Sequence, residues 1–138
     1  MKRTTCLGMT VVVLSLLGGC SAKARQAAEA ATRDFRAQYA RGAFAGVYKG
    51  AAPDLHSAVT EGDFVKLLEG VNRKLGAWQS SKSPGWRVFT GTGGQTVTLR
   101  YESEFEKGAA TEEFLWRIQG GGASLVGYHV NSPAFLTN

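Results

Sequence analysis

The spacing of apolar residues along the chain changes once, close to Gly76. Before this glycine, apolar residues recur every three to four positions, and after it they alternate with polar residues. The first spacing is the repeat of a helix that buries one side, and the second is that of a strand with one dry and one wet face. The pattern therefore predicts an α+β domain in which helices come first and an antiparallel sheet follows.

The first predicted helix runs from Ala24 to about Arg41, and Gly42 stops it. Its apolar side is formed by Ala28, Ala31, Phe35 and Tyr39. Large side chains occur only in the second half, because alanines dominate the first half. Alanine favours helix but buries little surface. We therefore expect the first turns to form a stalk or to fray rather than to join the core.

Two further helices are predicted before Gly76. A short one carries Phe44, Val47 and Tyr48 and is ended by Gly50 and Pro53. The other begins after Thr60, a good N-cap residue, and has acidic residues in its first turn. Its apolar stripe consists of Phe64, Leu67, Leu68, Val71 and Leu75.

Four antiparallel strands are predicted after Gly76, joined by tight glycine turns. The strand at 95–106 turns one set of side chains to the dry side, namely Val97, Leu99, Tyr101 and Phe105. The strand at 113–119 adds Phe114, Trp116 and Ile118 to that side, and a strand at 124–130 completes the meander. A shorter strand at 86–90 precedes them, and residues 77–81 are expected to begin it. The string Gly91-x-Gly93-Gly94 is interpreted as a hairpin turn rather than a nucleotide-binding loop, because no helix follows it.

The first nineteen residues have the three parts of an export signal. Lys2 and Arg3 form the positive start, the stretch 7–17 is apolar, and small residues follow. At about 1.5 Å per residue in a helix, the apolar stretch spans about 17 Å, well short of the roughly 30 Å hydrocarbon core of a membrane. The segment is therefore predicted to direct export and not to span the bilayer.

The string Leu17-Gly18-Gly19-Cys20 resembles the lipobox of bacterial lipoprotein signal peptides. The resemblance implies that residues 1–19 are cleaved off and that the thiol of Cys20 receives a diacylglycerol, with palmitate-type acyl chains holding the protein on a membrane. Two or three acyl chains would make this anchor effectively permanent. The alternative is an ordinary secretory signal that ends near Ala22 or Ala24, with Cys20 incidental.

Composition agrees with an exported, lipid-anchored protein. The chain has two cysteines, Cys6 and Cys20. The first would leave with the signal and the second would carry lipid, so no disulfide is expected. Removing residues 1–19 lowers Lys+Arg from 16 to 14 against 11 Asp+Glu, which leaves a net charge of +3. This small, scattered excess argues against nucleic acid as a partner.

The expected organisation follows from these boundaries. Residues 1–19 are the cleaved signal peptide, 20–24 the lipidated N-terminus and a short tether, 25–132 the α+β domain, and 133–138 a C-terminal tail. The short tether would keep the domain close to the lipid headgroups. Lys23 and Arg25 would then meet anionic phosphates there, or simply form a solvated helix face.

Three helices followed by a curled four-stranded antiparallel sheet resemble the cystatin-like and nuclear-transport-factor-2-like group of α+β cones, including small exported domains of unknown function. Two strings add to the order of elements: Gly42-x-Phe44-x-x-Val47-Tyr48 and Leu125-Val126-Gly127-Tyr128. The resemblance covers residues 24 to about 132. It implies that the first helix lies across the concave sheet and that a pocket can open between them. The group contains ketosteroid-isomerase-like enzymes, ligand binders and interaction modules, so the fold leaves the function open.

Few residues are candidates for catalysis. An acid and base pair would have to come from His129, Glu102, Glu104 and either Tyr101 or Tyr128. Strand alternation points the two glutamates away from the apolar side. A solvated face paired with Arg87, Arg100 or Arg117 is the competing interpretation. With His56 in a loop and only two histidines, no metal or other cofactor is expected.

The polar side of the sheet offers a candidate binding surface instead. Leu115 interrupts the polar series beside Arg117, and Phe89 and Val126 are expected on the same side. Scattered surface apolar residues are the alternative. The three tryptophans, Trp78, Trp86 and Trp116, are expected in the core or at its rim rather than in a ligand platform.

We therefore expect a lipid-anchored extracytoplasmic domain of the cell envelope that is not an enzyme and that binds an envelope protein or a second copy of itself. Ser21 after the cysteine favours the outer membrane, facing the periplasm, if the cell is Gram-negative. The alternative is a small apolar-ligand binder or an isomerase-like enzyme that uses the space between the first helix and the sheet. An open cavity lined by ionisable groups would favour this alternative, and an interior filled by aromatic and aliphatic side chains would favour the binding module.

Overall fold

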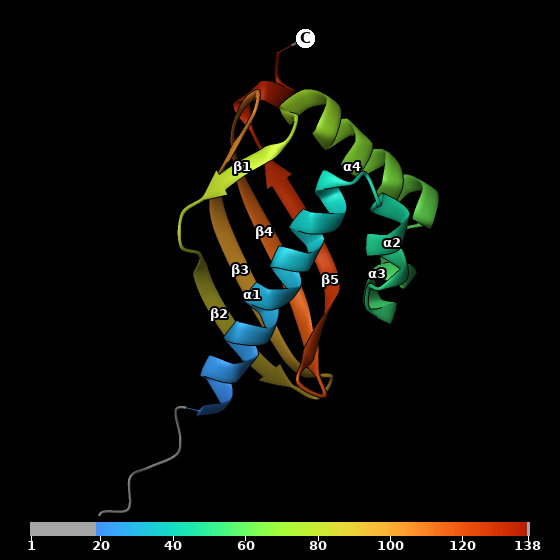
Figure 1. Ribbon diagram of the computed structural model, residues 1–138. Coiled ribbons are helices and arrows are strands. Elements are labelled where there is room, and N and C mark those ends of the chain that lie inside the picture. The colour runs from blue at the N-terminus through green and yellow to red at the C-terminus, as the bar shows by residue number, and fades with distance from the viewer. Residues whose placement is uncertain (1–18, 138) are drawn as a thin grey trace, which may run out of the picture.

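The first helix crosses one face of an antiparallel sheet, and the chain is an α+β structure as the apolar spacing predicted (Figure 1). The computed structural model describes residues 19–137. The predicted signal peptide, including Leu17 and Gly18 of the lipobox, lies outside the described residues. Within them, no helix combines the length and the apolar character needed to cross a membrane.

Four helices precede the sheet. They are α1 (Gly19–Ala40), α2 (Phe44–Lys49), α3 (Pro53–Ala58) and α4 (Glu61–Leu75). The prediction for α4 is confirmed in detail, because the Thr60 side chain accepts a hydrogen bond from the backbone N–H of Asp63 and Gly76 ends the helix with a positive φ of 73°. The helix α3 was not predicted. Pro53 begins it and places His56 on a helical turn rather than in a loop.

Helix α1 differs from the expected stalk. It begins at Gly19, so that the expected tether at 20–24 is helical, and Ala24 and Ala28 are buried. Small side chains allow the backbone of α1 to approach the sheet closely, so alanine at these positions permits contact rather than indicating its absence. The prediction that the first turns stand apart from the core was therefore wrong.

The sheet contains β1 (Trp78–Ser81), β2 (Gly85–Gly91), β3 (Gly94–Phe105), β4 (Gly108–Gln119) and β5 (Gly122–Asn131). Its order is β1-β3-β4-β5, and β2 also pairs with β3. The expected count of four strands needs correction, because β1 and β2 are separate strands that follow one another along the same edge of β3. Pro84, in the break between them, cannot donate a backbone hydrogen bond.

Inward side chains of β3, β4 and β5 meet α1 on the inner face, which we define as the face that α1 covers. The rings of Phe35, Phe114 and Tyr128 form its centre, with each pair of ring centroids 4.9–5.0 Å apart. A bulge in β5, opposite Leu115 and Trp116, allows both Leu125 and Tyr128 to face inward although they are three residues apart.

Helices α2, α3 and α4 lie on the β5 side of the inner face (Figure 1). The backbone N–H of Ala52 donates to the carbonyl of Leu125 at 2.9 Å, which covers part of the free edge of β5. Leu67 was expected in the apolar stripe of α4 but is 44% exposed, so it does not belong to the core. At the other end of the chain, the 3-10 turn η2 (Pro133–Phe135) lies within the expected tail and packs Ala134 and Phe135 against the core.

Candidate functional site

A buried carboxylate lies at the centre of the inner face. Glu112 of β4 has its side chain only 1% exposed. It faces inward because β4 alternates without interruption from Ala110 through Glu112 and Phe114 to Trp116, all of which are buried. The predicted strand began at residue 113, so Glu112 was missed. Extending that strand by one residue places the carboxylate of Glu112 on the dry side, two positions before Phe114.

Three side chains from three elements bind the two oxygens of Glu112. Nη2 of Arg36, on α1, lies 2.6 Å from Oε2, and the hydroxyl of Ser103, on β3, donates to the same oxygen at 2.6 Å. The hydroxyl of Tyr128, on β5, donates to Oε1 at 2.8 Å. The carboxylate therefore connects α1 to β3, β4 and β5, and both of its oxygens are occupied.

Arg36 is held by further contacts on the side of β1. Its Nη2 also donates to the hydroxyls of Ser81 and Ser103 at 3.2 and 3.4 Å. The guanidinium lies over the ring of Trp78, 4.4 Å from the ring centroid, and 5.4 Å from that of Tyr101. Trp78 in turn donates its indole N–H to the hydroxyl of Ser81 at 2.8 Å. We call Arg36, Glu112, Ser81, Ser103 and Tyr128 the buried polar cluster.

Every side-chain oxygen of the buried polar cluster takes part in a hydrogen bond. Among residues 19–137, no buried side-chain nitrogen or oxygen lacks a partner. Burying an ion pair costs several kcal/mol per ion in lost hydration, so such a pair often adds little net stability, while removing one partner is strongly destabilising. The cluster therefore favours the observed position of α1 on the sheet over positions in which the helix is shifted and the ion pair is broken.

Burial affects the tyrosines around this cluster. Burial, with a smaller contribution from the charge of Glu112, raises the pKa of Tyr39 to about 12. Burial and the same carboxylate raise the pKa of Tyr128 well above its ordinary value, and burial raises that of Tyr101. These hydroxyls are therefore protonated at neutral pH and act as donors, as Tyr39 does toward the carbonyl of Gly76 at 3.0 Å.

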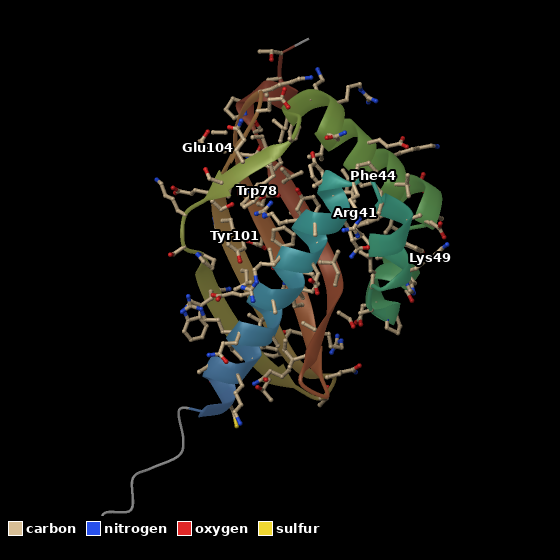
Figure 2. The ribbon with its side chains drawn as sticks, viewed as in Figure 1. Arg41, Phe44, Lys49, Trp78, Tyr101 and Glu104 are labelled. Carbon is tan, nitrogen blue, oxygen red and sulfur yellow. The ribbon has the colours of Figure 1, made fainter. Side chains whose placement is uncertain are left out.

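A pocket of about 490 Å³ opens beside the cluster, between α1 and the break that separates β1 from β2. Its lining includes Arg33, Arg36, Trp78, Lys82, Pro84 and Tyr101. Trp78 and Tyr101 lie close together between the sheet and α1 (Figure 2). The volume is within the usual range for pockets that take small molecules.

The predicted catalytic candidates separate into two groups. Tyr101 and Tyr128 lie on the inner face, near Glu112, whereas His129, Glu102 and Glu104 are exposed on the outer face. Glu102 forms an ion pair with Lys82 at 2.8 Å, and the hydrogen bond with Lys82 lowers the pKa of this carboxyl. The structure thus confirms that the glutamate row points away from the core, and it does not bring His129 or either glutamate to the tyrosines.

The expected pairing of the glutamate row with Arg87, Arg100 or Arg117 was wrong, because the arginines that form ion pairs have other partners. Arg100 lies 3.9 Å from Glu113. Arg117 instead forms two hydrogen bonds with the carboxylate of Asp54, on α3, at 3.1 and 2.9 Å. The bond from Arg117 lowers the pKa of the Asp54 carboxyl. This pair ties α3 to β4, a connection that strand alternation alone does not reveal.

Cys20 lies in the first turn of α1 with its side chain exposed. A shallow hollow of about 760 Å³ adjoins it and is bordered by Lys23, Ile118 and Gly121 among others.

His56 contacts the backbone of α2, because its Nε2 lies 2.7 Å from the carbonyl of Tyr48. Across the described part of the chain, no three His, Cys, Asp or Glu side chains gather as metal ligands.

Comparison with known proteins adds no relative from which a function could be carried over. The chain matches no protein-family model, no curated protein and no solved structure. The residues themselves therefore carry the functional argument.

The buried ion pair gives a stability prediction. Replacing Glu112 by Ala leaves the guanidinium of Arg36 buried without its partner, and we expect the free energy of unfolding to fall by about 3–5 kcal/mol. The double variant Arg36→Met with Glu112→Leu replaces the pair by apolar groups, and it should recover part of that loss, because the hydroxyls of Ser103 and Tyr128 still lose their acceptor. Urea unfolding followed by circular dichroism measures both. A double variant no more stable than Glu112→Ala would contradict this account.

The raised pKa of Tyr39 gives a pH prediction. Because the folded state holds this proton more tightly than the unfolded chain, whose tyrosine pKa is near 10, the stabilisation is complete below pH 10 and is lost as the pH rises toward 12. The loss is on the order of 2 kcal/mol. The variant Tyr39→Phe has no group to titrate at this position, but it also lacks the hydrogen bond to Gly76, so it should be less stable than the native protein at pH 7. The difference in the free energy of unfolding between the two proteins should narrow as the pH rises to 12. Parallel stability curves for the two proteins between pH 10 and 12 would refute the assignment.

Proposed function

We propose that this chain is a lipid-anchored protein of the extracytoplasmic cell envelope that acts by binding rather than by catalysis. The observation that carries the proposal is the string Leu17-Gly18-Gly19-Cys20 after a positively charged, apolar leader. If the cell is Gram-negative, Ser21 favours the outer membrane with the domain facing the periplasm. For the fold, we propose the cystatin-like and nuclear-transport-factor-2-like relationship, supported by a long first helix across an antiparallel sheet that does not close.

The position of Cys20 is compatible with acylation. The cysteine is exposed, and Ala24, one helical turn later, is already buried against the sheet. At about 1.5 Å per residue, only about 6 Å of helix separates the two. An acyl group on Cys20 would therefore hold the domain at the membrane surface, with Lys23 in the same first turns available to anionic headgroups.

The filling of the inner face supports binding over catalysis. Aromatic rings occupy the centre of the space between α1 and the sheet, and the pocket that remains lies at the sheet edge beside α1. The one carboxylate there, Glu112, already has both oxygens bound. A general base must reach the substrate proton, and Glu112 is buried and paired with Arg36, which disfavours that role.

The outer face of the sheet is the surface we propose for a protein partner, either an envelope protein or a second copy of this chain. Phe89 is 67% exposed there, and strand register places it in one row with Arg117. Leu115, half-buried, is the outward residue two positions from Arg117 on the same strand. Val126 is half-buried beside the β5 bulge. A mixture of apolar and charged groups of this kind is typical of protein interfaces.

The anchor is tested by the mass and the location of the mature protein. Native protein should begin at Cys20 with diacylglycerol on the thiol, float with membrane vesicles and partition into detergent. Cys20→Ala should lose the lipid mass and the detergent partition, whereas Cys6→Ala, a matched change in the segment to be removed, should retain both. A native N-terminus at another residue, or an unmodified thiol, would refute the anchor.

The partner surface is tested by site-specific photo-crosslinking in intact envelopes. A photoreactive residue at Phe89 should give a discrete crosslinked product, while the same residue at Leu67, an exposed leucine on α4, serves as the matched control. Peptide mapping then distinguishes a second copy of this chain from another protein. Equal crosslinking at the two positions would contradict the assignment of the outer face.

A further inference from the structure

The pocket beside α1 exists because the edge of the sheet is interrupted. β1 ends at Ser81, opposite Ser103, and β2 begins at Gly85, opposite Arg100. Between these points the chain stays tied to β3 by a backbone hydrogen bond from the Lys82 N–H to the carbonyl of Glu102 at 3.0 Å and by the ion pair of the same two residues. Tyr101 lies opposite the break on the inner face, so its ring forms a wall of the pocket that an unbroken edge strand would cover.

The pocket has an apolar side and a cationic side. Trp78, Tyr101 and Pro84 supply rings and methylene groups. Arg33 and Arg36, three positions apart on α1 and therefore on neighbouring parts of its surface, supply guanidinium groups. Lys82 also lines the pocket, and its ammonium group is paired with Glu102. Glu29 is the carboxylate among the lining residues, and Arg25 already pairs with it at 2.7 Å.

Arg36 has hydrogen-bonding capacity left for a ligand. Its recorded bonds to Glu112, Ser81 and Ser103 all come from Nη2. Its side chain is 10% exposed and lines the pocket, and among the described residues Nη1 and Nε have no hydrogen-bond partner. A guanidinium presents its donors in a fixed plane that matches a carboxylate, and shielding from water strengthens such a contact.

We propose that this pocket binds a small organic anion, with its carboxylate at Arg36 and Arg33 and a flat ring against Trp78 and Tyr101. Arg33, which forms no ion pair among the described residues, and the remaining donors of Arg36 set the preference for negative charge. The aromatic wall and the volume of about 490 Å³ set the preference for a ring-bearing molecule. The proposal is independent of the lipid anchor, because none of these residues depends on Cys20.

The site is tested by fluorine NMR of the mature protein, labelled with 5-fluorotryptophan and kept in detergent. Each of the three tryptophans gives one resonance, whose shift reports binding close to that residue. Benzoate and indole-3-acetate are the probes, and benzamide and indole-3-acetamide are their neutral counterparts. Each acid should shift the Trp78 resonance saturably and leave Trp116 in place, and each amide should bind at least about 10-fold more weakly. The assignment of Trp78 comes from Trp78→Phe.

Variants separate the pocket from general charge effects. Arg33→Gln and Lys82→Gln, both on exposed residues, should weaken binding of the acids about 3- to 10-fold. Arg41→Gln, in the turn directly after α1 and outside the pocket lining, should leave binding of the acids unchanged (Figure 2). Arg36→Lys keeps a cation opposite Glu112 but loses the planar fork, so it should weaken binding about 10-fold while thermal unfolding reports that the fold is retained.

The proposal is overturned if the acids and the amides bind equally, if no saturable shift appears at Trp78 up to millimolar concentration, or if Arg33→Gln behaves like Arg41→Gln. Ser83→Phe gives a steric check, because Ser83 lines the pocket at the break. This change should block the acids, and unchanged binding would place the ligand elsewhere.

Discussion

The contact between Arg36 and Glu112 is the constraint on which the arrangement of α1 and the sheet depends. Aromatic and aliphatic groups on the two surfaces attract one another without strong preference for one register. A buried carboxylate that needs donors from α1, β3 and β5 is satisfied in one register only. The same contact places Arg36 at the wall of the pocket, so the packing of the domain and its candidate ligand site share one residue.

Much of the fold could be predicted from the sequence because local signals agreed with the final structure. The change of period at Gly76 separates helices from strands, and the N-cap at Thr60 and the glycine turns mark boundaries that the structure retains. The prediction that Val97 and Leu99 of β3 and Phe114 of β4 face the core is also confirmed, because all three side chains are fully buried. These features depend on neighbours in the chain, which the sequence displays directly.

The candidate site was largely missed because it depends on contacts between residues far apart in the chain. Glu112 looked like one more polar residue at a strand boundary, and Arg36 like one more charge on a helix. Only the pairing of α1 with β4 shows that each neutralises the other. The pocket was missed for a related reason, since residues 77–81 were expected to lead into the strand at 86–90. The interruption at 82–84 creates the opening.

The continuity of α1 has a consequence for where the pocket operates. Arg33 is thirteen residues beyond Cys20 on one uninterrupted helix, a separation of about 20 Å. In an acylated protein this stiff link would confine the mouth to the water layer next to the bilayer, because the domain has no slack with which to swing outward. Anionic headgroups lower the concentration of dissolved anions within about 10 Å of the surface at 0.1 M salt, and out to about 30 Å at 0.01 M salt, a range that includes the mouth. Occupancy would then vary with lipid composition and ionic strength, and the pocket would respond to the state of the membrane as well as to the abundance of its ligand.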